Sequence, residues 1–260
     1  MTCRVQVIPK EKRRTMGPGA TVKTPYGLQV IESCLTCPLV KDRIFCDLPR
    51  PVLAALDAVS SSATYPKDAI LFVEGQEARG VFVLCNGRVK LSTGSADGKS
   101  IIVRVAEPRE MVGLPGTISG KPYEVTAEAL EPLQANFIRR EAFLRFLKEN
   151  GEVAVRVSEM LIQIYHATLA EVRYLGLSAS TAEKLARFLL DQPVRSMQEN
   201  GETRITVTLT HKEIAERIGA SRETVTRLFA NFKREQLVEV HGPSIVITNR
   251  TGLQRLVGAQ

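Results

Sequence analysis

Residues 208–232 read TLTHKEIAERIGASRETVTRLFANF, and this stretch decides how the C-terminal part of the chain is expected to fold. Thr210 and Glu213 have the spacing of a capping box, which predicts that a helix begins at this point. The next residues place an apolar face inward at helical spacing: Ile214, Ala215 and Ile218. Gly219 suits the left-handed turn that ends this helix, and Ser221 can cap a second helix. The pattern predicts a helix-turn-helix.

The second helix of this motif is expected to present a polar face outward. Val225 and Leu228 pack it against the first helix, which leaves an outward set of Arg222, Glu223, Thr226 and Arg227. Arginine can bond bidentately to guanine and glutamate can accept from cytosine, each such contact being worth about 1–3 kcal/mol of discrimination. We therefore predict a DNA-binding surface made by this set together with Thr210 and Ser221. The alternative is an ordinary helical hairpin with a solvated face.

Two short segments with period-two alternation follow the motif, at 237–240 and 244–247, around His241-Gly242-Pro243. They predict a hairpin, and a helix-turn-helix followed by a hairpin is a winged helix. Residues 203–250 carry eight Lys/Arg against five Asp/Glu, which suits phosphate contacts. Much of the net charge of +7 comes from residues 1–23, with six basic residues and one acid. Residues 1–30 are predicted to be a flexible basic tail.

Length and composition limit the remaining classes. A chain of 260 residues, 44% hydrophobic, can form two small domains with cores. The apolar runs are far shorter than about 20 residues, so we expect no membrane span and a cytoplasmic location. The three histidines, His166, His211 and His241, form no nucleophile or metal constellation, so no enzyme activity is expected. A roll-only signalling subunit is disfavoured by the predicted winged helix, and an architectural DNA binder without sensing is a further alternative.

The region before the winged helix changes period near residue 141. Residues 64–140 predict short strands joined by glycine-bearing hairpins, as in an antiparallel roll, with one turn at 96–99. After it, apolar residues recur at three- and four-residue intervals and predict a long helix. A homodimer interface is predicted along this seam, at Val153, Val157, Leu161, Ile164, Thr168 and Val172. The alternative is a helix that packs only on its own domain.

Three motifs resemble the cyclic-AMP receptor/fumarate-nitrate-reduction regulator (CRP/FNR) superfamily over about residues 34–250. They are Leu71-Phe72-x-x-Gly75, Phe82-x-Leu84-x-x-Gly87-x-Val89-x-Leu91 and Ser221-Arg222-Glu223-Thr224-Val225-x-Arg227. The resemblance implies an α+β fold, with an antiparallel β-roll resembling a cyclic-nucleotide-binding jelly roll, a long dimerisation helix and a C-terminal winged helix-turn-helix. The expected divisions are 1–30 (tail), 31–150 (cysteine segment and roll), 151–178 (dimer helix) and 179–260 (DNA-binding domain).

The same resemblance implies partners. In the cyclic-AMP receptor branch an Arg-Glu-x-x-x-Arg pattern reads TGTGA half-sites, and this pattern is present at Arg222, Glu223 and Arg227. Double-stranded DNA with a TGTGA-like palindrome is therefore the expected target, and RNA polymerase an expected partner.

The effector is less clearly indicated. The family's nucleotide cassette is Gly-Glu followed by Arg-Ser or Arg-Thr. Glu110 is present here, but Arg109 replaces the glycine and Pro122-Tyr123 replaces the phosphate pair after Lys121. The bidentate donor for a cyclic phosphate is missing, so a cyclic nucleotide is not the expected effector.

Cysteines provide the other sensor candidate, with the spacing Cys34-x2-Cys37-x8-Cys46. Three cysteines in 13 residues favour metal or redox ligands over a structural disulfide. They resemble the N-terminal cluster of the oxygen-sensing branch, which holds a [4Fe–4S] cluster with one distant cysteine. The equivalent of that distant ligand falls in 134–137, which lacks cysteine, so Cys85 or Cys3 is the candidate fourth ligand. A [4Fe–4S] cluster, a zinc site or thiol switch, and inert thiols stay open as alternatives.

Overall fold

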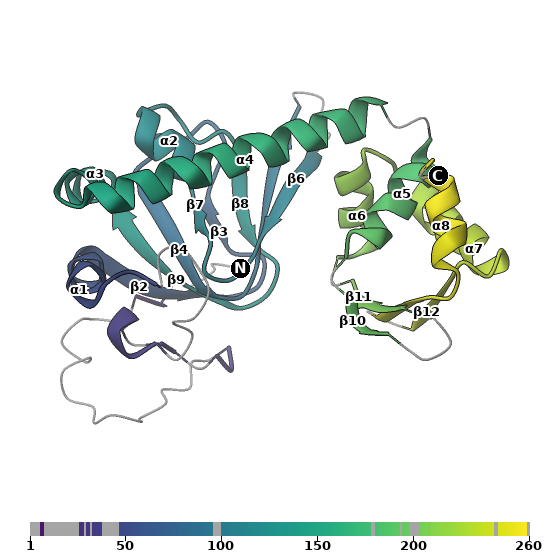
Figure 1. Ribbon diagram of the computed structural model, residues 1–260, viewed down its shortest axis with the longest axis horizontal. Coiled ribbons are helices and arrows are strands. Elements are labelled where there is room, and N and C mark those ends of the chain that lie inside the picture. Colours follow the sequence, from purple (N-terminus) through teal and green to yellow (C-terminus); the bar gives the residue numbers. More distant parts are fainter. Residues whose placement is uncertain are drawn as a thin grey trace. The chain divides into compact units, whose positions relative to one another are not determined.

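The chain is divided into two compact units in a computed structural model. One consists of Met1–Thr93 and Val103–Tyr165, and the other of Gly94–Ile102 and His166–Gln260 (Figure 1). The structure describes residues 6–7, 26–28, 30–31, 33–37, 47–95, 100–177, 180–192, 194–197, 203–207, 209–241 and 244–258. None of the helices in these ranges is both long enough and apolar enough to cross a membrane.

The first unit contains an antiparallel roll built from two sheets, in the orders β1-β2-β9-β4-β7 and β3-β8-β5-β6. Its strands are β1 (Gln6–Val7), β2 (Ser60–Tyr65), β3 (Ile70–Phe72), β4 (Gly80–Asn86), β5 (Val89–Gly94), β6 (Ser100–Ala106), β7 (Met111–Val112), β8 (Thr126–Ala129) and β9 (Leu133–Arg139). Alternate side chains of β4 face two cores, with Phe82 and Leu84 in one and Val81 and Val83 in the other. The roll predicted from short, glycine-punctuated strands is confirmed, although its turn at 96–99 lies outside the described residues.

Three helices accompany the roll: α1 (Arg50–Val59), α2 (Leu114–Ser119) and α3 (Arg140–Glu149). Leu53 and Leu56 of α1 and Phe143 of α3 are buried in one apolar cluster with Val81 and Ile138 of the sheet. The outer face of this sheet is therefore also buried, which explains why β4 is apolar on both sides.

Helix α4 (Gly151–Leu177) is the long helix that the sequence predicts, and its first turns bury the predicted apolar seam against their own unit. Val153 and Val157 are only 1% and 3% exposed, because they pack into the cluster formed by α1, α3 and the outer sheet face. Leu161 packs beside them and is half-buried. Val153 and Val157 therefore stabilise their own unit, as in the alternative of a helix that packs on its own domain.

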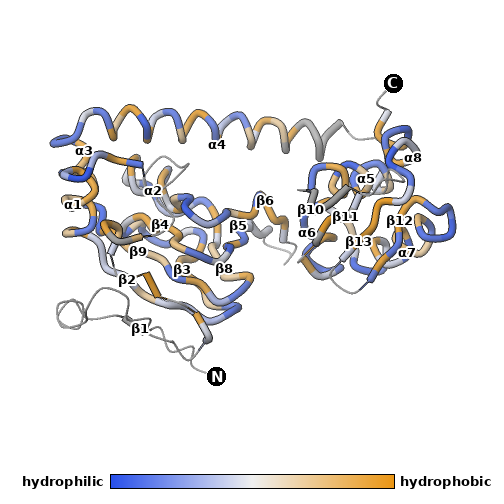
Figure 2. Tube along the Cα trace, turned by 60° about the horizontal axis from the view of Figure 1, so that its bottom comes forward, coloured by the Kyte–Doolittle hydropathy of each residue, from blue (hydrophilic) through white to orange (hydrophobic). Residues whose placement is uncertain are grey.

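A second apolar stripe runs along the exposed side of α4. Its exposed large apolar side chains are Val155, Ile162, Tyr165, Leu169 and Val172. Positions 155, 162 and 169 are seven residues apart, and positions 165 and 172 repeat the same interval, which is the heptad spacing of a coiled coil. Figure 2 shows apolar and polar segments alternating along the helix. Of the predicted seam, Thr168 and Val172 are exposed and Ile164 is half-buried.

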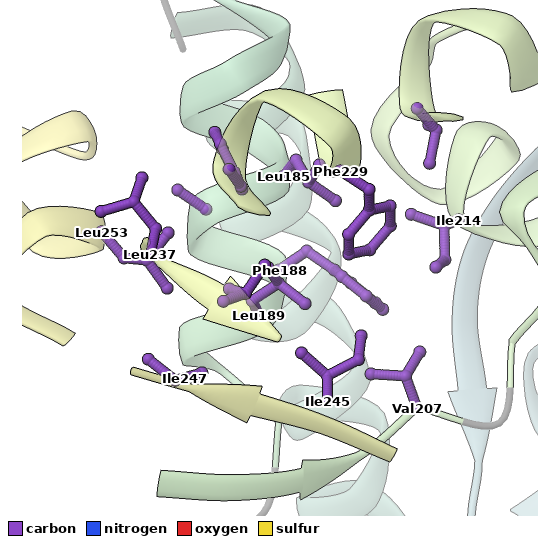
Figure 3. Close-up of a cluster of buried hydrophobic side chains, with 14 of the residues drawn as sticks. Leu185, Phe188, Leu189, Val207, Ile214, Phe229, Leu237, Ile245, Ile247 and Leu253 are labelled. Carbon is purple, nitrogen blue, oxygen red and sulfur yellow. The ribbon is translucent and has the colours of Figure 1, made fainter. Parts of the chain in front are cut away.

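The second unit combines four helices with the four-stranded sheet β10-β11-β13-β12. Its further elements are α5 (Thr181–Leu190), β10 (Val194–Met197), β11 (Thr203–Thr206), α6 (His211–Ile218), α7 (Arg222–Arg234), β12 (Val238–His241), β13 (Ser244–Ile247) and α8 (Arg250–Leu256). Leu185 and Leu189 of α5, Phe229 of α7 and Ile245 of β13 converge on one buried core (Figure 3). Ser180 caps α5 by accepting a hydrogen bond from the backbone N–H of Glu183 at 3.1 Å.

The predicted flexible tail lies largely outside the described residues. Within it, Gln6 and Val7 form strand β1 and pair antiparallel with Thr64 and Ala63 of β2. Residues 6–7 of the predicted tail therefore form a short strand on the edge of the sheet.

Candidate nucleic-acid interface

The helix-turn-helix is fixed by local capping interactions. The Thr210 hydroxyl accepts from the Glu213 N–H at 3.2 Å, and the Glu213 carboxylate accepts from the Thr210 N–H at 2.8 Å. Gly219 ends α6 in the left-handed conformation, at φ 66°. The Ser221 hydroxyl then accepts from the Thr224 N–H at 3.2 Å and starts α7. Within the predicted DNA-binding set, the side chains of Thr210 and Ser221 thus have a structural part as helix caps.

Helix α7 presents Arg222, Glu223 and Arg227 to solvent, while Val225 and Phe229 on its other side are buried. The Arg227 guanidinium makes no hydrogen bond or ion pair with another described residue, so its N–H donors are available to a ligand. The pKa of Glu223 is lowered by hydrogen bonds from its own backbone N–H and from Ser221, and further by the charge of Arg222. The outward face of α7 therefore carries two guanidinium groups and one ionised carboxylate in its first two turns.

Thr226 is exposed as predicted, but its hydroxyl is already engaged. It donates to the backbone carbonyl of Arg222 at 3.0 Å and lies 3.0 Å from Nδ1 of His211 in α6. The His211 ring stacks on Phe229 with centroids 5.0 Å apart and planes 9° apart. His211 thus joins the two helices of the motif, a role that sequence inspection missed because the contact spans 15 residues.

The wing matches its prediction. Strands β12 and β13 pair from Val238–Ile247 to His241–Ser244, and β13 continues the sheet by pairing with β11. Ile245 and Ile247 point into the core, which anchors the hairpin beside α7. Residues 242–243 at its tip lie outside the described part of the chain.

The nucleotide cassette of the roll is altered in structure as well as in sequence. Glu110 lies between β6 and β7, where its carboxylate forms an ion pair with Arg104 of β6. Arg109 beside it adopts φ 73°, a left-handed conformation that glycine adopts without steric cost. This φ value is a physical reason for the glycine of the family pattern. The Glu110 carboxylate thus already has an internal partner in Arg104.

The helix that follows also lacks the required chemistry. Gly113 precedes α2 in the left-handed conformation, and the next residue, Leu114, is fully buried and apolar. After α2, Lys121 is exposed, while the ring of Tyr123 is buried and stacks on Phe72 at 4.0 Å. No arginine stands where the family pattern has one, and Tyr123 occupies interior space.

The described part of the cysteine segment is held on the roll by side chains of α1 and β9. The Cys34 N–H donates to Asp57 at 3.0 Å, and the Asn136 amide donates to the Cys34 sulfur at 3.4 Å. The Gln134 amide accepts from the Ile31 N–H at 2.7 Å and donates to the Ile31 carbonyl at 2.6 Å. Asn136 is a buried residue of β9. Its hydrogen bond places the Cys34 sulfur beside the strand in which the family resemblance expects the distant ligand.

The cysteines are only partly brought together. Cys34 and Cys37 flank one 3-10 turn, Cys34–Thr36, and both are half-buried. Cys85 lies on β4 where the register shifts between Leu84 and Asn86, and its thiol lies 4.0 Å from the Val83 carbonyl. The described residues contain no group of three His, Cys, Asp or Glu that could hold a metal. Within the described part of the chain, Cys85 thus does not form such a group with Cys34 and Cys37. Cys46 and Cys3 lie outside the described residues.

A capped recognition helix beside a β-hairpin, in a chain that also forms a β-roll, defines a winged-helix transcription regulator. Comparison with known proteins agrees. A family model described as a Crp-like helix-turn-helix domain matches residues 183–256, and one described as a cyclic nucleotide-binding domain matches residues 63–150. The chain belongs to the CRP/FNR superfamily of transcription regulators and is not an enzyme.

The relatives of this chain include regulators with CRP-like and Fnr names. The CRP-like cAMP-activated global transcriptional regulator of Mycobacterium tuberculosis is 26% identical over 220 residues, covering 84% of this chain and 97% of that protein. The transcriptional activator protein FnrA of Stutzerimonas stutzeri is 28% identical over 209 residues, covering 78% and 82%. The solved structure of FixK2 from Bradyrhizobium japonicum covers 76% of this chain and 97% of its own, with a TM-score of 0.66 and 23% identity, and supports the fold.

Proposed function

We propose that this regulator binds, as a homodimer, palindromes of TGTGA-like half-sites, with Arg222, Glu223 and Arg227 as base readers. The main support for this proposal is that these three side chains are exposed on the first two turns of a capped helix. Arginine suits the two guanines of the half-site and an ionised carboxylate suits a cytosine N4 donor. The hydroxyl of Thr226, bonded to Arg222 and His211, is a weaker candidate for base contact.

The homodimer is supported by the exposed heptad stripe of α4. Two such stripes can pair in a parallel coiled coil, with Ile162 and Tyr165 facing their symmetry mates. A two-fold axis along this helix would set two recognition helices one DNA turn apart, about 34 Å. Recruitment of RNA polymerase belongs to the same proposal, since a regulator of this class acts at promoters.

The DNA proposal is tested by fluorescence anisotropy with labelled duplexes. One duplex carries two TGTGA half-sites with centres about 10 base pairs apart, a second carries one half-site and a third has both scrambled. We expect the palindrome to bind at least about a thousandfold tighter than the scrambled duplex. Equal affinity for all three duplexes at fixed salt would leave a nonspecific DNA binder.

We further propose that the N-terminal cysteines make DNA binding responsive to redox state. The support is that Cys34 is tied to the roll through its own sulfur, by Asn136, while Asp57 holds its backbone. Oxidation of that thiol, or its use as a metal ligand, would change an acceptor on which this docking depends. Cys34 and Cys37 alone do not complete a metal site in the described residues, so a [4Fe–4S] cluster or zinc requires Cys46 and a further ligand.

The test compares wild type with Cys34→Ala, and with Cys85→Ala as a matched control on β4. Each protein is purified without oxygen and assayed for iron, zinc and palindrome affinity before and after exposure to air. We expect air to change the affinity of wild type and Cys85→Ala, and not of Cys34→Ala. An unchanged wild type without metal would favour the alternative, a regulator of the same fold with inert thiols.

A cyclic nucleotide remains the alternative effector. The ion pair of Glu110 with Arg104, the apolar Leu114 and the absent arginine after α2 argue against it. Calorimetric titration with cyclic AMP and cyclic GMP should therefore give no saturable binding.

A further inference from the structure

The roll contains a cavity whose lining differs from the altered nucleotide cassette and shares only Tyr123 with it. Its volume is about 340 Å³, within the range of about 300–1,000 Å³ found for small-molecule sites. Phe72, Phe82, Tyr123 and Phe137 form its aromatic part, and the exposed Glu77 and Arg79 stand at its rim. No residue of the predicted DNA-binding set and none of the described residues of the cysteine segment lines it.

The aromatic part is a packed set of rings. Phe72 and Tyr123 are stacked 4.0 Å apart, Phe72 and Phe82 lie 5.9 Å apart, and Phe82 and Phe137 lie 4.8 Å apart. Phe72, Phe82 and Tyr123 are buried, whereas Phe137 keeps part of its surface exposed. A flat apolar ring could extend this series by offset or edge contact with Phe137 and Phe82.

The rim is held in place by Tyr123. The Gly75 N–H donates to the Tyr123 carbonyl at 2.8 Å, and the Tyr123 N–H donates to the Gln76 carbonyl at 2.8 Å. At the end of the loop formed by residues 75–80, the Tyr123 hydroxyl donates to the Gly80 carbonyl at 2.6 Å. The loop from 75 to 80 is therefore fixed on both sides of the cavity, so a ligand would meet a largely preformed site.

The charged side chains at the rim indicate which polar group a ligand would carry. The Arg79 guanidinium makes no ion pair or hydrogen bond with another described residue. Burial raises the pKa of the Tyr123 hydroxyl, and the charge of Arg79 opposes part of this rise. Arg79 lines the cavity together with Tyr123, Phe82 and Phe137, so its guanidinium can bind an anionic group there. Glu77 is equally without an ion pair among the described residues, and its negative charge disfavours a ligand with more than one negative charge.

We propose that this cavity binds a small aromatic monocarboxylate, with its ring against Phe82 and Phe137 and its carboxylate paired bidentately with Arg79. A fork-to-carboxylate contact is directional and charge-assisted, so it orients the ring as well as adding affinity. The site is independent of the proposed DNA target and of the cysteine chemistry.

Three probes of one shape test the charge requirement on the full-length protein: benzoate, neutral benzamide and cationic benzamidine. Calorimetry should show benzoate binding at least about tenfold tighter than benzamide, as expected for a charge-assisted hydrogen bond, with benzamidine weakest. Equal affinity for all three, or no saturable benzoate binding, would overturn the proposal.

Variants locate the site. Arg79→Gln, on an exposed side chain, should reduce benzoate affinity to that of benzamide, and Phe137→Ala should weaken benzoate and benzamide together. Lys121→Gln is the matched control, because Lys121 is the exposed cation of the altered cassette and does not line the cavity. Benzoate binding that survives Arg79→Gln, or that disappears in Lys121→Gln, would place the anion elsewhere. Circular dichroism and thermal melting confirm that each variant is folded.

Discussion

Replacing Ile162 with glutamate should convert the protein from dimer to monomer without unfolding it. Ile162 is 56% exposed in the single chain, so the substitution removes little packing within the first unit. In a parallel two-fold dimer each residue 162 faces its symmetry mate, so one substitution brings two carboxylates together.

The magnitude can be worked from the exposed stripe. Full burial of an apolar side chain is worth about 1.5–3 kcal/mol, so covering the exposed half of each is worth about 1 kcal/mol. Five side chains from each of two protomers then contribute about 10 kcal/mol, before an association cost of about 4–15 kcal/mol. Two unpaired carboxylates in such a seam cost several kcal/mol each, so dimer affinity should fall by at least about a thousandfold.

The assay is sedimentation velocity at several concentrations, with chemical unfolding measured in parallel. Val157→Ala is the matched control, since Val157 is 3% exposed and packs within its own unit. It should lower the unfolding free energy by about 2–3 kcal/mol while leaving the dimer intact. A dimeric Ile162→Glu, or a folded but monomeric Val157→Ala, would refute the assignment of faces on α4.

Further expectations concern single side chains. Arg227→Ala should lose about 1–3 kcal/mol on the palindrome in an anisotropy titration and almost nothing on scrambled DNA; an equal loss on both would make Arg227 a phosphate contact. Thr210→Ala removes a cap and should lower the unfolding free energy by about 1 kcal/mol with site preference retained; a changed preference would mean that Thr210 also reads DNA. Arg109→Gly removes the strain of the left-handed φ of 73° and should raise the free energy of unfolding by up to about 1 kcal/mol. It should not create cyclic AMP binding. The pKa of Glu223 is lowered in the folded protein, so its ionised carboxylate stabilises the fold above the unfolded pKa, and this contribution is lost as pH falls through the folded pKa. Ser221→Ala should raise the folded-state pKa of Glu223 in an NMR titration. An unchanged pKa would exclude the Ser221 contact.

The elements that could be predicted are those fixed by neighbours in sequence. The capping box of Thr210 and Glu213, the left-handed Gly219 and the Ser221 cap each depend on residues within one turn, and each occurs as predicted. Alternating strands around glycines likewise predicted the roll and the wing.

The face of α4 could not be predicted in this way. The helix carries two apolar stripes, one through Val153 and Val157 and another through Ile162 and Tyr165. Periodicity identifies both as apolar, but only the position of α1 and α3 decides which one the chain covers itself. Pairings between distant residues, such as His211 with Thr226, have no local signal either.

The clamp that Gln134 forms on Ile31 has a consequence for how the N-terminal segment can vary. Its amide bonds both the N–H and the carbonyl of one peptide residue, and it also donates to the Ser62 hydroxyl at 2.9 Å. At position 31 Gln134 bonds only main-chain atoms, so these bonds do not discriminate among side chains there. The Gln134 anchor itself therefore sets no requirement on the side chain at position 31, and main-chain hydrogen bonding alone fixes the course of the segment at this point.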